Sequence, residues 1–78
     1  MSINIQDFSK VFSREYNYLY ENRDQVAGYN EAVDAFDNFI HTDNGRAFIG
    51  EFARYRGDLI TSDREAAAFM FALDTMTA

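Results

Sequence analysis

Hydrophobic positions recur at three- and four-residue steps along most of the chain, which is the spacing of an amphipathic helix. Four such segments cover approximately residues 5–22, 24–41, 44–57 and 63–76. The loops left between them are short. We therefore predict an all-α fold, a compact bundle of about four short helices that forms a single domain over residues 1–78.

Capping residues support three of the predicted helix starts. Asn4 is a suitable N-cap for the first helix, and either Thr42 or Asp43 for the third. Ser62 and Glu65 have the spacing of a capping box directly before the apolar run of the last helix.

Glycine sets the remaining boundaries, since the chain contains no proline. The segment 43–45, Asp-Asn-Gly, is the clearest turn signal and separates the second helix from the third. Gly57 predicts the end of the third helix, because a glycine inside a helix costs about 1 kcal/mol relative to alanine.

The last helix is apolar on nearly every side, which is typical of a helix at the centre of a core or covered by another chain. If a second copy covers it, Phe69, Met70 and Phe71 are the residues that we expect at the interface of a homodimer.

The charge pattern excludes one class of function and favours another. The net charge is −6, and the chain has seven basic residues without a cluster, so direct binding to nucleic acid is not expected. Between Arg23 and Arg46 every formally charged side chain is acidic. Such a surface suits either solubility alone or a basic partner protein. The residues that we expect to form a partner-binding acidic face are Glu21, Asp24, Glu31, Asp34 and Asp37, with Glu15 if it is exposed.

Two charged residues fall within apolar arcs. Glu15 lies between Phe8 and Val11 on a helical wheel, and Arg56 lies on the apolar side of the third helix. Because an unpaired buried charge is very costly, we expect them to form a buried ion pair or each to find another buried partner. The alternative is that both lie at the boundary of the core with their charged groups in water.

No catalytic, cofactor or metal site is predicted. The chain has no cysteine, its serines have no nearby base, and its glycines form no phosphate-binding loop. His41 is the single histidine, and with Asp37 it offers two ligands where a metal site needs three or four.

The same composition favours a cytoplasmic protein. A small secreted domain usually needs disulfides, and the first residues lack the features of a signal peptide. The longest uncharged apolar run, residues 66–73, is too short to cross a bilayer.

We therefore interpret the chain as a non-enzymatic inhibitor that presents an anionic helical face to a basic, nucleic-acid-handling protein. In size, acidity and helical content it resembles the small phage-encoded proteins that block restriction or CRISPR nucleases. This resemblance of overall character implies a DNA mimic that acts against a defence nuclease in the host cytoplasm. The alternatives are a homo-oligomeric structural or regulatory domain that uses its last helix, and a binder of a small molecule or peptide in an aromatic pocket.

Overall fold

The computed structural model describes residues 3–78, and this part of the chain contains four α-helices and no strand. α1 (Ile5–Asn22) runs into a single 3-10 turn, η1 (Arg23–Gln25). α2 (Tyr29–Phe39), α3 (Asp43–Arg56) and α4 (Asp63–Thr77) follow. The predicted all-α bundle is confirmed.

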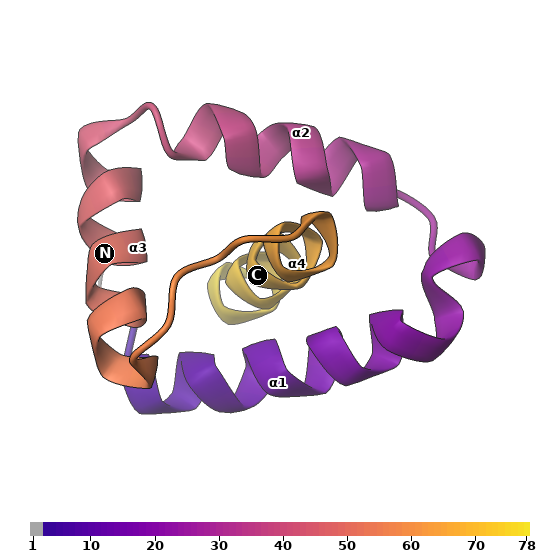
Figure 1. Ribbon diagram of the computed structural model, residues 1–78, viewed down its shortest axis with the longest axis horizontal. Helices are drawn as coiled ribbons and strands as arrows, with labels where there is room; N and C mark the ends of the chain where they lie inside the picture. Colours follow the sequence, from indigo (N-terminus) through magenta and orange to yellow (C-terminus); the bar gives the residue numbers. More distant parts are fainter. Residues whose placement is uncertain (1–2) are drawn as a thin grey trace.

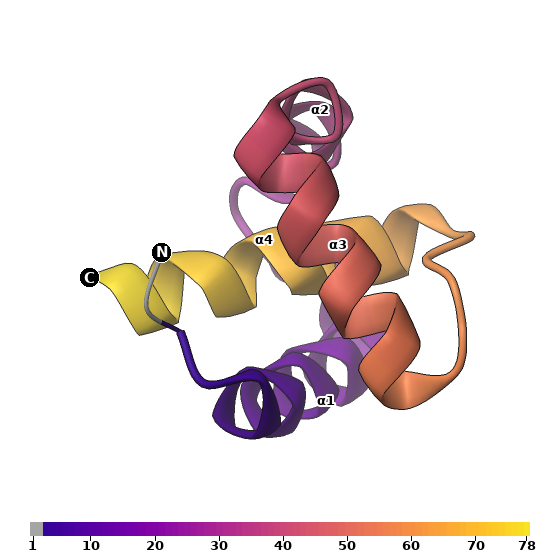
Figure 2. The same ribbon diagram turned by 90° about the vertical axis from the view of Figure 1, so that its left-hand side faces the viewer.

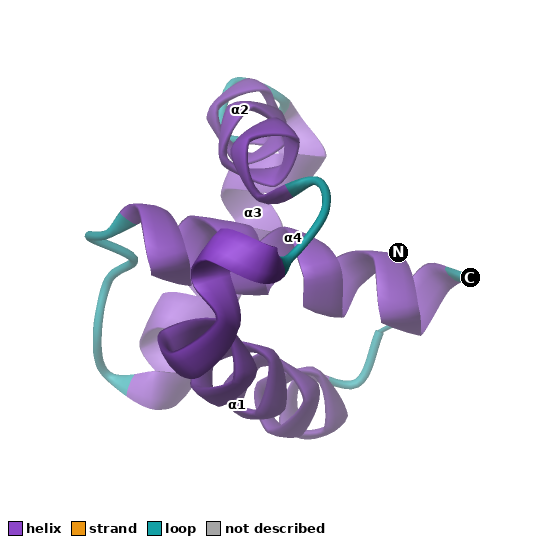
Figure 3. Ribbon diagram, turned by 90° about the vertical axis from the view of Figure 1, so that its right-hand side faces the viewer, coloured by secondary structure: helices purple, strands orange, loops and turns teal. Residues whose placement is uncertain are grey.

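Three helices surround the fourth. Viewed along α4, α1 and α2 form opposite sides of a frame, α3 closes one end, and α4 passes through the middle (Figure 1). The two side views place α4 between α1 and α2, with α3 crossing it (Figures 2 and 3). This position explains why α4 is apolar nearly all round: its neighbours lie on several sides.

A cluster of phenylalanine rings centred on Phe69 of α4 forms the core. Phe69 is fully buried, and the centroids of five other phenylalanine rings lie between 4.9 and 5.9 Å from its own. These rings are Phe8 of α1, Phe36 and Phe39 of α2, and Phe48 and Phe52 of α3. Most of the pairs meet edge to face, the arrangement that ring quadrupoles favour.

The burial of Phe69 corrects one expectation from the sequence. Phe69 is enclosed by its own chain, so it cannot contribute to a surface for a second copy. Met70 and Phe71 are half-buried and pack against the same core.

The helix predicted over residues 24–41 is wrong at both ends, since α2 covers only residues 29–39. Val26 has an extended backbone, with φ −89° and ψ 118°, and Gly28 has φ 85°. A helix cannot continue through these conformations, and the second is one that glycine adopts without a steric penalty. Periodicity misleads here because Val26 is half-buried and packs against the core without being helical.

The other boundaries follow the predicted caps closely. The side chains of Asn4, Thr42 and Ser62 accept hydrogen bonds from the first turns of α1, α3 and α4. α3 ends before Gly57, which has φ 72°.

The turn expected at residues 43–45 lies earlier, because those residues belong to the first turn of α3. Gly45 is needed there for a close approach to α2. A Cβ atom at this position would lie 1.8 Å from the carbonyl oxygen of Phe39.

We predict that truncation of Phe69 destabilises the whole domain. Phe69→Ala should lower the free energy of unfolding by about 3–5 kcal/mol, because the cavity would separate rings from three other helices. The matched control is Tyr18→Ala, which removes an aromatic ring from a site that is 55% exposed and should cost much less. Urea unfolding followed by circular dichroism measures both, and equal effects would contradict a core centred on Phe69.

Candidate functional site

Three acidic residues line the outer face of α2. Glu31, Asp34 and Asp37 are all exposed, whereas Ala32 and Phe36 turn toward the core. This division follows from the sequence, because steps of three residues keep the carboxylates near one side of the helix. We call Glu31, Asp34 and Asp37 the acidic face of α2.

No side chain of the acidic face forms an ion pair within the described part of the chain. The ion pairs found among residues 3–78 join Arg23 to Asp24, Arg46 to Asp43 and Arg56 to Glu65, and none involves α2. Glu31 lies in the first turn of α2, where the helix dipole favours a negative charge. Asp34 and Asp37 lack this benefit, and solvent and salt screen their mutual repulsion.

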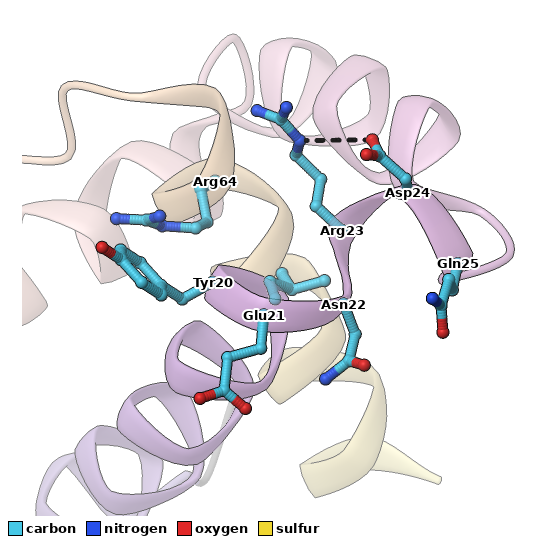
Figure 4. Close-up of a pocket in the computed structure, with 8 residues that line it drawn as sticks. Tyr20, Glu21, Asn22, Arg23, Asp24, Gln25 and Arg64 are labelled. Carbon is cyan, nitrogen blue, oxygen red and sulfur yellow. Dashed lines mark ion pairs between the residues drawn. The ribbon is translucent and has the colours of Figure 1, made fainter.

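The other acidic residues expected at the site are placed differently. Asp24 lies in η1, 3.6 Å from the guanidinium of Arg23, and both side chains are mostly exposed. Glu21 is exposed at the end of α1, and its carboxylate points away from Asp24 (Figure 4). Glu15 is half-buried. The structure therefore assembles three of the predicted carboxylates on one helix and leaves Glu21 and Asp24 at the neighbouring corner.

A small polar pocket of about 170 Å³ lies at that corner, between the end of α1, η1 and Arg64. The guanidinium of Arg64 lies over the rings of Tyr16 and Tyr20, 4.4 and 4.5 Å from their centroids, and donates a hydrogen bond to the Tyr16 hydroxyl. The labelled side chains around the pocket point in different directions (Figure 4). Arg64 thus packs α4 against α1. The described polar groups around the pocket do not converge on one point where a ligand could bind.

Glu15 and Arg56 do not pair with each other. The other expectation, that each finds a different buried partner, holds for Arg56 but not for the half-buried Glu15, which takes part in no ion pair among residues 3–78. Arg56 instead meets Glu65, with 2.6 Å between Nη2 and Oε2 and only 19% and 13% of the two side chains exposed. The guanidinium also lies 5.2 Å from the ring centroids of Phe12 and Phe52. The sequence patterns of the single helices could not reveal this partner. Glu65 belongs to α4, and it lies beside Arg56 only because the chain turns back at the end of α3.

The pair of Arg56 and Glu65 holds the loop between α3 and α4. Arg56 donates hydrogen bonds to the carbonyl oxygens of Asp58 and Leu59, and Glu65 accepts one from the backbone N–H of Thr61. Burial raises the pKa of Glu65, but the hydrogen bond and charge of Arg56, with the N–H of Thr61 and the Ser62 hydroxyl, outweigh it and hold the pKa below the usual range of a glutamate. This contact fixes where α4 enters the bundle.

No group of three or more His, Cys, Asp or Glu side chains among residues 3–78 is placed to hold a metal ion. In the same part of the chain, no helix combines the length and the apolar character needed to cross a membrane. Comparison with protein-family models, curated proteins and solved structures gives no significant match.

We predict that Glu65→Gln lowers the free energy of unfolding at pH 7 by about 2–3 kcal/mol. Glutamine can still cap α4, so the loss reports on the charge facing Arg56. The control Arg46→Gln removes an exposed ion pair and should cost less than about 1 kcal/mol.

The loss should depend on pH with a definite sign. Because folding lowers the pKa of Glu65, its charge stabilises the fold above the unfolded pKa, and this contribution disappears as the pH falls through the folded pKa. Urea unfolding of both proteins between pH 7 and pH 3 should show the gap closing below pH 4.5. A gap that stays constant over this range would contradict the ion pair.

Proposed function

We propose that this protein is a non-enzymatic binding protein that presents the acidic face of α2 to a basic surface on a partner protein. The observation that carries the proposal is the segregation of charge: Glu31, Asp34 and Asp37 are exposed on one helix that has no basic residue. A positively charged partner surface would supply the ion pairs that these carboxylates do not form with residues 3–78.

The acidic face is held by the core. Phe36 and Phe39 project from α2 onto Phe69, so the helix that carries the carboxylates is attached to the centre of the domain. Binding would therefore cost little ordering of the backbone, which favours affinity.

The negative charge of the acidic face supports a partner that binds nucleic acid, since the basic groove of such a protein attracts anions. At a rise of about 1.5 Å per residue, the face carries one charge for roughly every 4.5 Å of helix axis. One strand of B-DNA carries a phosphate about every 3.4 Å. The two spacings are of the same order but do not match, so the proposal rests on the sign of the charge. The mechanism that we propose is competition for a groove that neutralises a phosphate backbone. A defence nuclease is the partner class that the overall character of the chain suggests.

Self-association through α4 has less support than this proposal. Of the three residues expected at that interface, Phe69 lies inside the domain, and Met70 and Phe71 are half-buried. An aromatic-lined pocket for a small molecule or peptide is likewise not favoured, because the phenylalanine rings fill the core with one another.

We predict that neutralising the acidic face abolishes partner capture. The variant carries Glu31→Gln, Asp34→Asn and Asp37→Asn together, and its binding to basic nucleic-acid-binding proteins should fall at least about tenfold, equivalent to about 1.4 kcal/mol. The measurement is capture from a nuclease-treated bacterial lysate, followed by elution with increasing salt and quantitative mass spectrometry.

The matched control changes three exposed acidic residues on other parts of the surface, Glu51→Gln, Asp58→Asn and Asp74→Asn. Both triple variants remove three negative charges from a net charge of −6, so they differ in position rather than in total charge. Equal capture by the two variants would show that α2 has no special role.

A further inference from the structure

A shallow groove lies beside the acidic face, between α2 and the start of α4, and both apolar and polar side chains line it. Its volume is about 240 Å³, and its apolar lining includes Val33, Phe36 and Ile40 on the α2 side and Ile60 in the loop before α4. This volume is below the roughly 300–1,000 Å³ of typical small-molecule pockets, so it fits a single side chain better than a cofactor.

The floor of the groove is preformed. Val33, Phe36 and Ile60 are half-buried and pack against the core, and Ile40 is half-buried beside them. The ring of Phe36 meets that of Phe69 with 5.4 Å between centroids, which fixes its position. A side chain entering the groove would therefore meet a fixed apolar surface.

The charges along the groove are negative. Asp37 of α2 and Asp63 of α4 both line it and are exposed, and its lining contains no basic residue. The nearest cations in sequence are engaged elsewhere, because Arg64 lies over Tyr16 and Tyr20. Arg56 likewise points to Glu65 rather than to the groove. Asp37 belongs to the acidic face as well, so the groove and that face are continuous.

We propose that this groove is the anchor site of the acidic face, where one aliphatic side chain of a basic partner segment is buried. Lysine or arginine residues next to that side chain pair with Asp37 and Asp63. This inference rests on the proposed function. It adds the contact that fixes where the partner segment lies along the acidic face. Charge attraction alone brings a partner to the surface but does not fix its position there. A buried apolar side chain surrounded by polar contacts fixes that position.

The test uses two synthetic peptides that differ only at the anchor. Each has four lysines and blocked ends, with leucine at the centre of one and serine at the centre of the other. Each is titrated into the protein at low salt, and backbone amide and methyl signals are followed by NMR. The leucine peptide should bind at least severalfold more tightly and shift the methyl signals of Val33, Ile40 and Ile60, whereas the serine peptide should shift mainly the amides of the acidic face.

The outcomes separate the two proposals. If both peptides shift the amides of Glu31, Asp34 and Asp37 with equal affinity and leave the groove methyl signals unchanged, the anchor is wrong and the acidic face stands. If neither peptide shifts those amides, the proposed function fails as well. If the groove methyl signals move on dilution of the protein alone, a second copy fills the groove and the inference is overturned.

A groove variant provides the matched control. Ile40→Ser should remove the preference for leucine over serine, because the leucine side chain loses an apolar contact in the groove. If circular dichroism shows that this variant is unfolded, Ile40→Ala tests the same point with a smaller change. A preference for leucine that survives in the folded variant would contradict the anchor site.

Discussion

Packing of phenylalanine rings around Phe69 is the interaction on which the rest of the structure depends. A domain of 78 residues has a small interior, so one fully buried ring that meets five others accounts for much of its core. Since these rings come from α1, α2 and α3, α4 must pass between them. The alanines of α4 that are buried beside Phe69, residues 66–68 and 72, allow the surrounding helices to approach closely.

This central position of α4 determines which surfaces face outward. α2 lies against α4 with Phe36 and Phe39, so its opposite side, which bears the acidic face, faces solvent. The loop after α3 must bring the chain back to the middle of the frame, and the pair of Arg56 and Glu65 holds it there. The same return places Ile60 and Asp63 beside α2, which creates the groove. The central position of α4 thus determines both the fold and the proposed binding surface.

The fold class and most helix ends could be predicted because they depend on local chemistry. Helical spacing, the caps at Asn4 and Ser62 and the glycine at position 57 act within a few residues of where they lie. The start of α2 was missed because Val26 contributes an apolar contact from an extended backbone. The partner of Arg56 and the burial of Phe69 depend on which helices meet, which a helical wheel does not contain. The exposure of the acidic face followed from its spacing, whereas the groove arises from a loop and two helices together.

The most direct test of the central claim is a competition experiment on a partner captured through the acidic face. The purified partner is bound to this protein, duplex DNA is added in increasing amounts, and the fraction still bound is measured. If the acidic face occupies a groove that binds nucleic acid, DNA should displace the protein, with a midpoint that follows the ratio of the two affinities. A stable complex of all three components, with the protein retained at saturating DNA, would contradict competition for that groove.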